Sequence, residues 1–323
     1  MMKKSVVYTL IIISGIIVIL LYGIRRSPFG RDNTSFAVKE GTDITGIDLI
    51  QGEKKVILRK EDNEWRLNST LEVRKSAVQF IIRTLREMRI KSPVSTEMFR
   101  SEIADKKIEP VRVNVYERRR VVRSFYVYKT GANIYGNIMK IRPSSGPFIV
   151  YLPGYEDNIG SHFVVNELFW QPFNVFRLLP SQIESVELRN FIDRESSFTV
   201  RNSGEIFSVY DSNGPVTGCD PAKVKRYISY FVNVSFESWA FDLNEEQKRE
   251  ILASEPLYNV VVIKADGGTI KLTVWEKWKY ENGEKVKDSD RVWGETNDGK
   301  GVFVMRYFDL DPVIKKKSYF FGG

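Results

Sequence analysis

The sequence predicts an α+β fold in which an N-terminal transmembrane helix precedes two repeated, mostly antiparallel β-sheet units, each with one main amphipathic helix. Three observations predict this fold: an uncharged apolar run near the N-terminus, alternating apolar stretches bounded by polar turns, and an order of elements that occurs twice. The 323 residues suit about two domains. We expect an anchor at 1–26, a linker at 27–43, a first α+β repeat at 44–155, a packed connecting segment at 156–181 and a second α+β repeat at 182–323.

The membrane anchor is predicted from Val6 to Ile24, a run of 19 residues without a charge. A helix of this length spans about 28 Å, close to the hydrocarbon thickness of a bilayer. Lysines precede the run and arginines follow it, so the charges do not decide the orientation. The short N-terminal tail and the long chain that follows favour a signal-anchor with the C-terminal bulk exported. A cleaved signal peptide is the competing interpretation, although its apolar core is normally about 7–15 residues long and ends at a small-residue site.

The first repeat begins with alternating apolar residues at 44–50 and 56–67, a pattern typical of half-buried strands joined in hairpins. A helix is predicted next, because apolar residues recur at helical spacing at Val78, Ile81, Ile82 and Leu85. The remaining elements are a polar helical stretch, a hairpin with an arginine run at its tip and a closing apolar strand: 97–110, 111–128 with Arg118, Arg119 and Arg120, and 148–152.

The second repeat has the same order of elements. Alternating stretches at 183–189 and 198–209 precede a helix with Asp220 as its N-cap and Pro221 as its first residue. Corresponding helix positions in the two repeats differ by 146, as Val78 and Val224 do. A polar helical stretch, a hairpin with a strong turn signal and an apolar strand complete the repeat: 245–256, 258–276 with Asp266, Gly267 and Gly268, and 302–308. We therefore predict two copies of a β-β-α-β-β-β unit.

The segment between the repeats, 156–181, is rich in aromatic residues and contains His162, the single histidine of the chain. An exposed linker is normally polar and rich in proline, glycine or serine. We therefore expect this segment to pack between the two halves. The stretch 27–43 has the character of a true linker that holds the folded part slightly off the membrane.

The composition excludes several classes of function. The single cysteine, Cys219, excludes an intramolecular disulfide and any cysteine-based zinc or iron–sulfur site within one chain. The single histidine excludes paired-histidine metal motifs. The 49 Lys+Arg exceed the 41 Asp+Glu and give a net charge of +8, but five of these cations flank the anchor and most others alternate with acids. We therefore predict no nucleic-acid partner, and a solvated hairpin tip for the arginine run.

His162 and Cys219 are the two candidates for a catalytic base or nucleophile. The sequence contains neither the G-x-S-x-G nucleophile elbow nor an H-E-x-x-H helix. Aromatic surroundings favour a packed histidine. Cys219 precedes the helix cap Asp220, and a helix N-terminus can lower the pKa of a thiol, but no histidine lies near it in the sequence. We predict structural roles for both side chains.

Paired carboxylates are the remaining route to catalysis, because glycoside hydrolysis requires only two of them. The visible pairs are Asp288 with Asp290, in a long charged hairpin, and Asp309 with Asp311, at a strand end. The turn at 297–299 lacks the alternating ligand series of a calcium loop, and no phosphate-binding glycine motif occurs. We therefore predict no catalytic, cofactor-binding or metal-binding residues, and no cofactor.

Six tryptophans and fifteen tyrosines would suit a platform on which sugars stack. Trp275 and Trp278 are three residues apart, however, so on a strand they face opposite sides. Trp293 lies on the adjacent predicted strand. A role in the core and at the edge of the sheet is favoured over a platform.

Several stretches together resemble a known family: the N-terminal anchor, FAVKEGTDITGIDLI (36–50), NEWRL (63–67), RIKSPV (89–94) and PFIVYLPGYEDNIGSHF (147–163). With the duplication, they make the chain similar to the domain-of-unknown-function family four-three-four-zero of bacterial envelopes. The resemblance covers nearly the whole exported part and carries over no catalytic residue. It implies a single-pass protein that faces the periplasm, encoded beside ABC-type export components similar to the gliding-motility auxiliary system.

We therefore expect a non-enzymatic protein of the inner (cytoplasmic) membrane, whose duplicated module contacts a partner such as the subunits of an ABC-type exporter. Two similar modules on one tether suit two related surfaces, or one surface with internal pseudo-symmetry. The alternatives are a cell-wall or glycan binding module, with carboxylate-dependent hydrolysis as a weaker extension, and a structural spacer. The sequence does not separate these three hypotheses.

Overall fold

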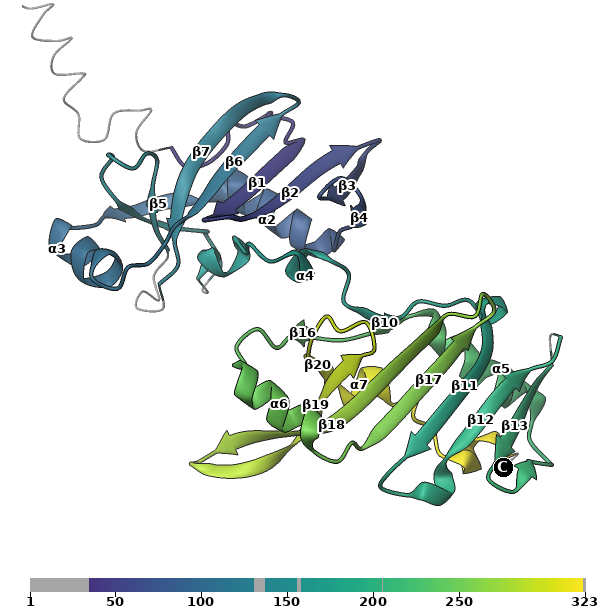
Figure 1. Cartoon of the computed structure of the whole chain (residues 1–323). Coiled ribbons are helices and arrows are strands. Elements are labelled where there is room, and N and C mark those ends of the chain that lie inside the picture. The colour runs from purple at the N-terminus through teal and green to yellow at the C-terminus, as the bar shows by residue number, and fades with distance from the viewer. Residues whose placement is uncertain (1–34, 131–136, 156–157, 205, 322–323) are drawn as a thin grey trace, which may run out of the picture. The chain divides into compact units, whose positions relative to one another are not determined.

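The computed structural model describes residues 35–130, 137–155, 158–204 and 206–321, and shows a mixed α+β fold with two large antiparallel sheets and few helices (Figure 1). The chain divides into two compact units, the first ending at Pro172 and the second beginning at Phe173. The predicted anchor from Val6 to Ile24 lies outside the described residues. Within the described ranges, no helix is long and apolar enough to cross a membrane.

The first sheet has nine strands among the described residues, in the order β4-β3-β2-β1-β6-β7-β8-β9-β5. All its neighbouring strands are antiparallel. The strands are β1 (Gly46–Gln51), β2 (Lys54–Glu61), β3 (Glu64–Leu67), β4 (Leu71–Glu72), β5 (Arg89–Pro93), β6 (Val111–Glu117), β7 (Arg120–Tyr128), β8 (Asn137–Lys140) and β9 (Phe148–Tyr151). The helical elements of this unit are α2 (Lys75–Glu87), α3 (Thr96–Phe99), the π-helical turn η1 (Arg100–Ala104), the 3-10 turn η2 (Ile159–His162) and α4 (Glu167–Trp170).

The second large sheet also has nine strands among the described residues, in the order β14-β13-β12-β11-β17-β18-β19-β20-β16. These strands are β11 (Ile183–Asn190), β12 (Phe198–Asn202), β13 (Phe207–Asp211), β14 (Gly214–Pro215), β16 (Ser238–Trp239), β17 (Tyr258–Lys264), β18 (Thr269–Glu281), β19 (Glu284–Thr296) and β20 (Phe303–Arg306). A separate small sheet pairs β10 (Asn174–Phe176) with β15 (Val234–Ser235). The helical elements are α5 (Pro221–Ser229), α6 (Glu245–Ala253), α7 (Tyr307–Leu310) and the 3-10 turns η3 (Pro180–Gln182), η4 (Arg194–Ser196), η5 (Tyr230–Val232) and η6 (Lys317–Phe320).

The two sheets have the same strand order, which agrees with the predicted duplication. In each unit four strands lead into a long helix, an edge strand and a short helix follow, and four more strands complete the sheet. The description β-β-α-β-β-β is therefore too short. It gives five strands per unit, whereas each large sheet has nine among the described residues. The omitted strands include the edge strand β5 and the edge strands β4, β14 and β16, which are two residues long and too short for a recognisable alternation of apolar residues.

The hairpin tips and the main helices lie where the sequence predicts them. Glu117 pairs with Arg120, so the arginine run forms the tip of the β6–β7 hairpin, and Ile263 pairs with Thr269 around the Asp-Gly-Gly turn. Asp220 caps α5, because its carboxylate accepts the N–H of Ala222 at 2.8 Å. The amphipathic spacing of α2 is realised by burial of its apolar side, which includes Val78, Ile81 and Leu85.

The helix α2 joins the two opposite edges of the first sheet, because β4 precedes it and β5 follows it. Thirteen helical residues and the three residues that connect them to these strands reach about 30 Å. Eight strand spacings in a flat sheet would cover about 38 Å. The sheet must therefore curl around α2, which runs behind β1, β2, β6 and β7 in Figure 1.

Alternation along the strands divides the first sheet into a core face and an opposite face. The core face packs against α2 and is apolar, with residues such as Ile47, Leu49 and Val113 fully buried. On the opposite face a second, smaller core forms where Ile103, after α3, packs against Ile138 of β8. The rest of this opposite side spans β2, β1, β6 and β7 and lies outside the small core. We name it the first open face.

Two segments differ from the expected domain borders. Phe36 and Val38 lie in the predicted linker, yet both are buried in the first core, and the N–H of Val38 donates to the carbonyl of Leu85 at 2.8 Å. The connecting segment is shared by the two units. Trp170 belongs to the first core, whereas Phe176 belongs to the second.

Candidate interaction faces

A buried carboxylate lies at the centre of the first open face. Asp48 of β1 is only 3% exposed. Its Oδ1 is 2.7 Å from Nη2 of Arg59 on β2, and its Oδ2 accepts a hydrogen bond from the Tyr116 hydroxyl on β6 at 3.1 Å. Nζ of Lys55 approaches Oδ2 at 3.5 Å. Three strands therefore supply one cluster around a single acid, and we name it the Asp48 cluster.

A glycine makes room for this cluster. Gly46 pairs with Arg59 on one side and with Tyr116 on the other, so both long side chains extend over a position without a Cβ. The guanidinium of Arg59 lies 4.7 Å from the centre of the Tyr116 ring, a cation–π contact. A Cβ on Gly46 would be only 3.0 Å from Nη1 of Arg59. Glycine at this position is therefore part of the geometry of the cluster.

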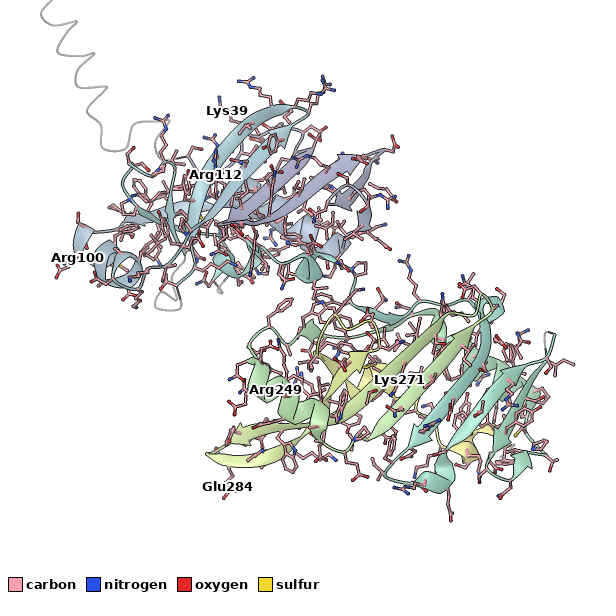
Figure 2. All side chains as sticks on the ribbon, viewed as in Figure 1. Lys39, Arg100, Arg112, Arg249, Lys271 and Glu284 are labelled. Atoms are coloured by element: carbon pink, nitrogen blue, oxygen red, sulfur yellow. The ribbon has the colours of Figure 1, made fainter. Side chains whose placement is uncertain are left out.

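The electrostatics of the Asp48 cluster keep the Tyr116 phenol as a hydrogen-bond donor. Burial, the charge of Asp48 and the hydrogen bond to it raise the pKa of the Tyr116 hydroxyl, so the phenol stays protonated at neutral pH and remains a donor. The carboxylate is enclosed by donors and cations, which would repel a metal ion. Beside the cluster, Arg112 of β6 is exposed and carries no ion pair with a described residue (Figure 2). The guanidinium group of Arg112 is therefore accessible on the first open face.

The corresponding place in the second unit is built differently. Glu187 of β11 has the register position of Asp48, but it pairs with Arg189 of its own strand at 2.5 Å, and its side chain is 35% exposed. Arg201 corresponds to Arg59, yet it stacks on Tyr210 of β13 at 4.9 Å. Ser185, which has a Cβ, stands at the register position of Gly46.

The two units also differ in charge. Residues 35–172 contain 23 Lys+Arg and 17 Asp+Glu, whereas residues 173–323 contain 21 Lys+Arg and 23 Asp+Glu. The excess of positive charge of the folded part therefore belongs to the first unit. Two copies of one topology thus differ in net charge, positive in the first unit and nearly balanced in the second.

His162 is packed among aromatic rings of the first unit. Its Nε2 is 2.7 Å from the Tyr155 hydroxyl, and its ring lies 4.1 Å from the ring of Phe80 on α2. Phe169 approaches the imidazole at 6.4 Å. These contacts hold η2 and the following segment against α2. The imidazole is thus part of the packing of the first unit.

Cys219 lies beside α5 but lacks the character of a nucleophile. Its backbone forms an isolated bridge with Phe321 near the end of the chain. Burial raises the pKa of the thiol, the opposite of the lowering that a helix N-terminus can cause. The thiol is therefore protonated at neutral pH.

Asp288 and Asp290 form a structural bulge rather than a pair of facing carboxylates. The register between β18 and β19 jumps here, so that Lys277 faces four residues, 288–291. Asp288 is 3% exposed, and its Oδ1 accepts the N–H groups of Asp290 and Arg291, each at 3.1 Å. Its Oδ2 accepts Nζ of Lys277 at 3.1 Å. Burial alone would raise the pKa of Asp288, but the lysine and the backbone N–H groups lower it below its ordinary value.

The other acidic candidates are also engaged locally. Asp309 lies in α7 and accepts Nε of Arg306 at 3.0 Å. Asp298 closes the turn at 297–299 by accepting the Thr296 hydroxyl at 2.8 Å and the N–H of Lys300 at 3.2 Å. In the described part of the chain, no group of three or more potential ligands is arranged to hold a metal ion.

The tryptophans divide between core and edge, as the spacing predicts. Trp275 is 5% exposed and donates its indole N–H to the carbonyl of Ser254 at 3.2 Å. Trp278 is 46% exposed and Tyr280 is 76% exposed. These two residues are two apart on β18, so they share one side of the hairpin that extends beyond the second sheet toward Glu284 (Figures 1 and 2). We name them the hairpin aromatics.

Comparison with known proteins gives no relative from which a role for these faces could be transferred. No protein-family model, no curated protein and no solved structure matches the chain. The site is therefore defined by its own geometry.

Sequence reasoning missed the Asp48 cluster, although one signal for it exists. An acid inside the apolar stretch that becomes β1 alternates correctly with Ile47 and Leu49, so its position on the opposite face follows from the pattern. Its burial does not follow, because Arg59 and Tyr116 come from strands that only the fold brings together. The sequence shows that the hairpin aromatics are aromatic residues, but it does not predict that β18 and β19 extend beyond the sheet.

Proposed function

We propose that this protein is a non-enzymatic, membrane-anchored envelope protein whose two repeated sheet units act as interaction modules. In this proposal the run from Val6 to Ile24 is the transmembrane anchor in the inner membrane, and the folded units face the periplasm or the outside. The proposal includes the resemblance to the domain-of-unknown-function family four-three-four-zero. An accessory role beside an ABC-type exporter or a gliding-motility-like system follows from that resemblance.

The observation that carries the proposal is the divergence of the open faces on a shared topology. Both sheets have one strand order, but the first unit builds the Asp48 cluster over Gly46 and the second unit does not. Packing of the core accounts for the topology that the two units share. Exposed arginines such as Arg112 contribute little to the stability of the fold, so folding alone does not account for them. Different exposed chemistry on the same scaffold supports two distinct contacts.

The test is crosslinking of the full chain in cells, followed by purification in mild detergent and mass spectrometry. We expect transporter or motility subunits in near-stoichiometric amount. The variant Arg112→Glu should lose a partner that docks on the first open face, and Arg249→Glu, an exposed arginine on α6, serves as the matched control. Recovery of the chain alone, or turnover of a substrate by the purified protein, would contradict the proposal.

A second candidate function, binding of a cell-wall polymer or another glycan, is favoured by the hairpin aromatics. Exposed rings at i and i+2 on one side of a strand form a row on which a sugar can stack. Lysines of this hairpin are partly neutralised, since Lys279 pairs with Glu281 at 2.6 Å and Lys287 with Glu276 at 2.5 Å. An uncharged ligand therefore suits the hairpin better than a strongly anionic one.

The glycan hypothesis is tested by retention of the detergent-solubilised full chain on insoluble wall polymer. The double variant Trp278→Ala/Tyr280→Ala should lose retention. Phe308→Ala removes an aromatic side chain that is 83% exposed on α7 and is not part of the hairpin strands, and should leave retention unchanged. Absence of retention by the unmodified chain, or equal retention by both variants, would count against it.

A further inference from the structure

The end of the β6–β7 hairpin concentrates positive charge at an exposed turn. Arg118 adopts a left-handed backbone conformation with φ 54°, and it forms the two-residue turn together with Arg119. Arg120 begins β7 opposite Glu117. All three arginines are exposed. A hairpin end with three adjacent guanidinium groups is a compact cationic surface, which we name the arginine tip.

The charges of the arginine tip are not neutralised within the first unit. Among the described residues, Arg118, Arg119 and Arg120 form no ion pair, and Arg112 and Arg123 on the same hairpin form none either. Glu117 is the single acid of the hairpin strands, and its Oε1 accepts the N–H of Asp43 at 3.1 Å. Some other cations of this unit are paired, as Lys106 is with Glu102 at 2.6 Å. The three exposed arginines of the tip are therefore accessible to an external anion.

The second unit has no counterpart of this feature. Its equivalent hairpin end, between β17 and β18, is Asp266-Gly267-Gly268, and Lys264 there is paired with Asp266 at 2.9 Å. The duplicated fold therefore does not require an arginine run at this turn. The charge is specific to the first unit, which is also the unit with an excess of Lys+Arg.

The position of the first unit along the chain brings the arginine tip close to the membrane, a step that rests on the proposed anchor. Ten residues, 25–34, separate the end of the apolar run from Ser35. Fully extended, they reach about 35 Å, so Ser35 stays within about that distance of the bilayer surface. The tip is near this start of the unit, because Glu117 beside it accepts the N–H of Asp43. A tethered cationic surface in this range has anionic lipid at high effective concentration.

We propose that the arginine tip docks on the anionic phospholipid headgroups of the membrane that holds the anchor. Each lysine or arginine near an anionic surface favours contact about fivefold, and guanidinium groups donate to phosphate oxygens in bidentate geometry. Val121, next to the run, is 48% exposed and can enter the interface between the headgroups. Docking at this point orients the first unit relative to the bilayer while the tether alone would leave it free to rotate.

The test uses the full chain in lipid nanodiscs and a fluorescent probe at the tip. The probe is attached to Val121→Cys in a Cys219→Ser background, and spin-labelled headgroups serve as quenchers. We expect strong quenching in discs with about one-third phosphatidylglycerol, and little in pure phosphatidylcholine. Raising the ionic strength from about 50 to about 500 mM should reverse the quenching, because salt screens exposed charges. The triple variant Arg118→Gln/Arg119→Gln/Arg120→Gln should lower the ratio of docked to free tip about a hundredfold.

The duplication supplies the matched control. A probe at Asp266→Cys, on the equivalent hairpin of the second unit, should show no dependence on phosphatidylglycerol. Equal quenching at residue 121 in anionic and neutral discs, or quenching unchanged in the triple variant, overturns the docking proposal. Failure of the chain to co-purify with discs of any composition would instead refute the anchor, so the two failures are distinguishable.

Discussion

Replacement of Asp48 by asparagine tests whether the Asp48 cluster is a stabilising part of the first unit. The change preserves the shape of the side chain but removes the charge that Arg59 and Tyr116 both contact. A hydrogen bond to a charged group contributes about 1.5–3 kcal/mol, and loss of one partner of a fully buried ion pair costs about 3–5 kcal/mol. The side chains of Arg59 and Lys55 are 30% and 45% exposed, so water can solvate them after the change. We therefore expect a loss of about 2 kcal/mol in the free energy of unfolding of the first unit.

The assay is native-state hydrogen exchange in increasing urea, followed at amides of β1 and β6, because it reports the stability of each unit separately. The internal control is Glu187→Gln, which removes the corresponding acid of the second unit. Its side chain is 35% exposed and its partner Arg189 is 61% exposed, so the expected loss is below about 0.5 kcal/mol. A loss for Asp48→Asn as small as that of Glu187→Gln would refute the reasoning from burial.

Three further predictions follow from individual contacts. Gly46→Ala should lower the free energy of unfolding, measured with urea, by about 1 kcal/mol, because the added Cβ would lie 3.0 Å from Nη1 of Arg59 and displace it. The control Gly146→Ala meets no atom within 4 Å and should leave the free energy of unfolding unchanged. The pKa of Asp288 lies below its ordinary 3.8 in the folded state. The stability that Asp288 gives the second unit is therefore complete above pH 3.8 and is lost as the pH falls through the lowered folded-state pKa. Acid unfolding of the variant Asp288→Asn should lack this dependence on pH. Tyr227→Phe should cost about 1–2 kcal/mol, because the buried hydroxyl donates to the carbonyl of Val313 at 2.9 Å, and the exposed Tyr280→Phe should leave the thermal midpoint unchanged.

The class of fold and its duplication were predictable because they depend on local patterns. Alternation of apolar residues marks the central strands, and the Asp-Pro start signal locates α5 correctly. The Asp-Gly-Gly turn likewise fixes the β17–β18 hairpin. In each case the physical cause acts within a few residues, so a single sequence contains it.

The rest depends on contacts between distant segments. Asp288 looked like half of a carboxylate pair, but its burial depends on a four-residue bulge opposite Lys277 that no local pattern encodes. Tyr307 and Phe308 continue an apolar strand pattern, yet they begin α7, which carries Leu310 into the second core. The Asp48 cluster is likewise a product of register among three strands.

The edges of both sheets have a consequence for how any partner can be recognised. The strands β4, β14 and β16 are two residues long, while β5 ends at Pro93 and has an irregular register between Ile90 and Ser92. Such edges expose few consecutive backbone N–H and C=O groups, and proline removes a donor. These four edge strands therefore offer little template for an added strand. The projecting part of the β18–β19 hairpin differs, because β17 pairs with β18 only up to Val274 and β20 pairs with β19 only from Arg291. At the four short edges, the proposed contacts would therefore depend on side chains, where substitutions can change a contact without disturbing the hydrogen-bonded frame.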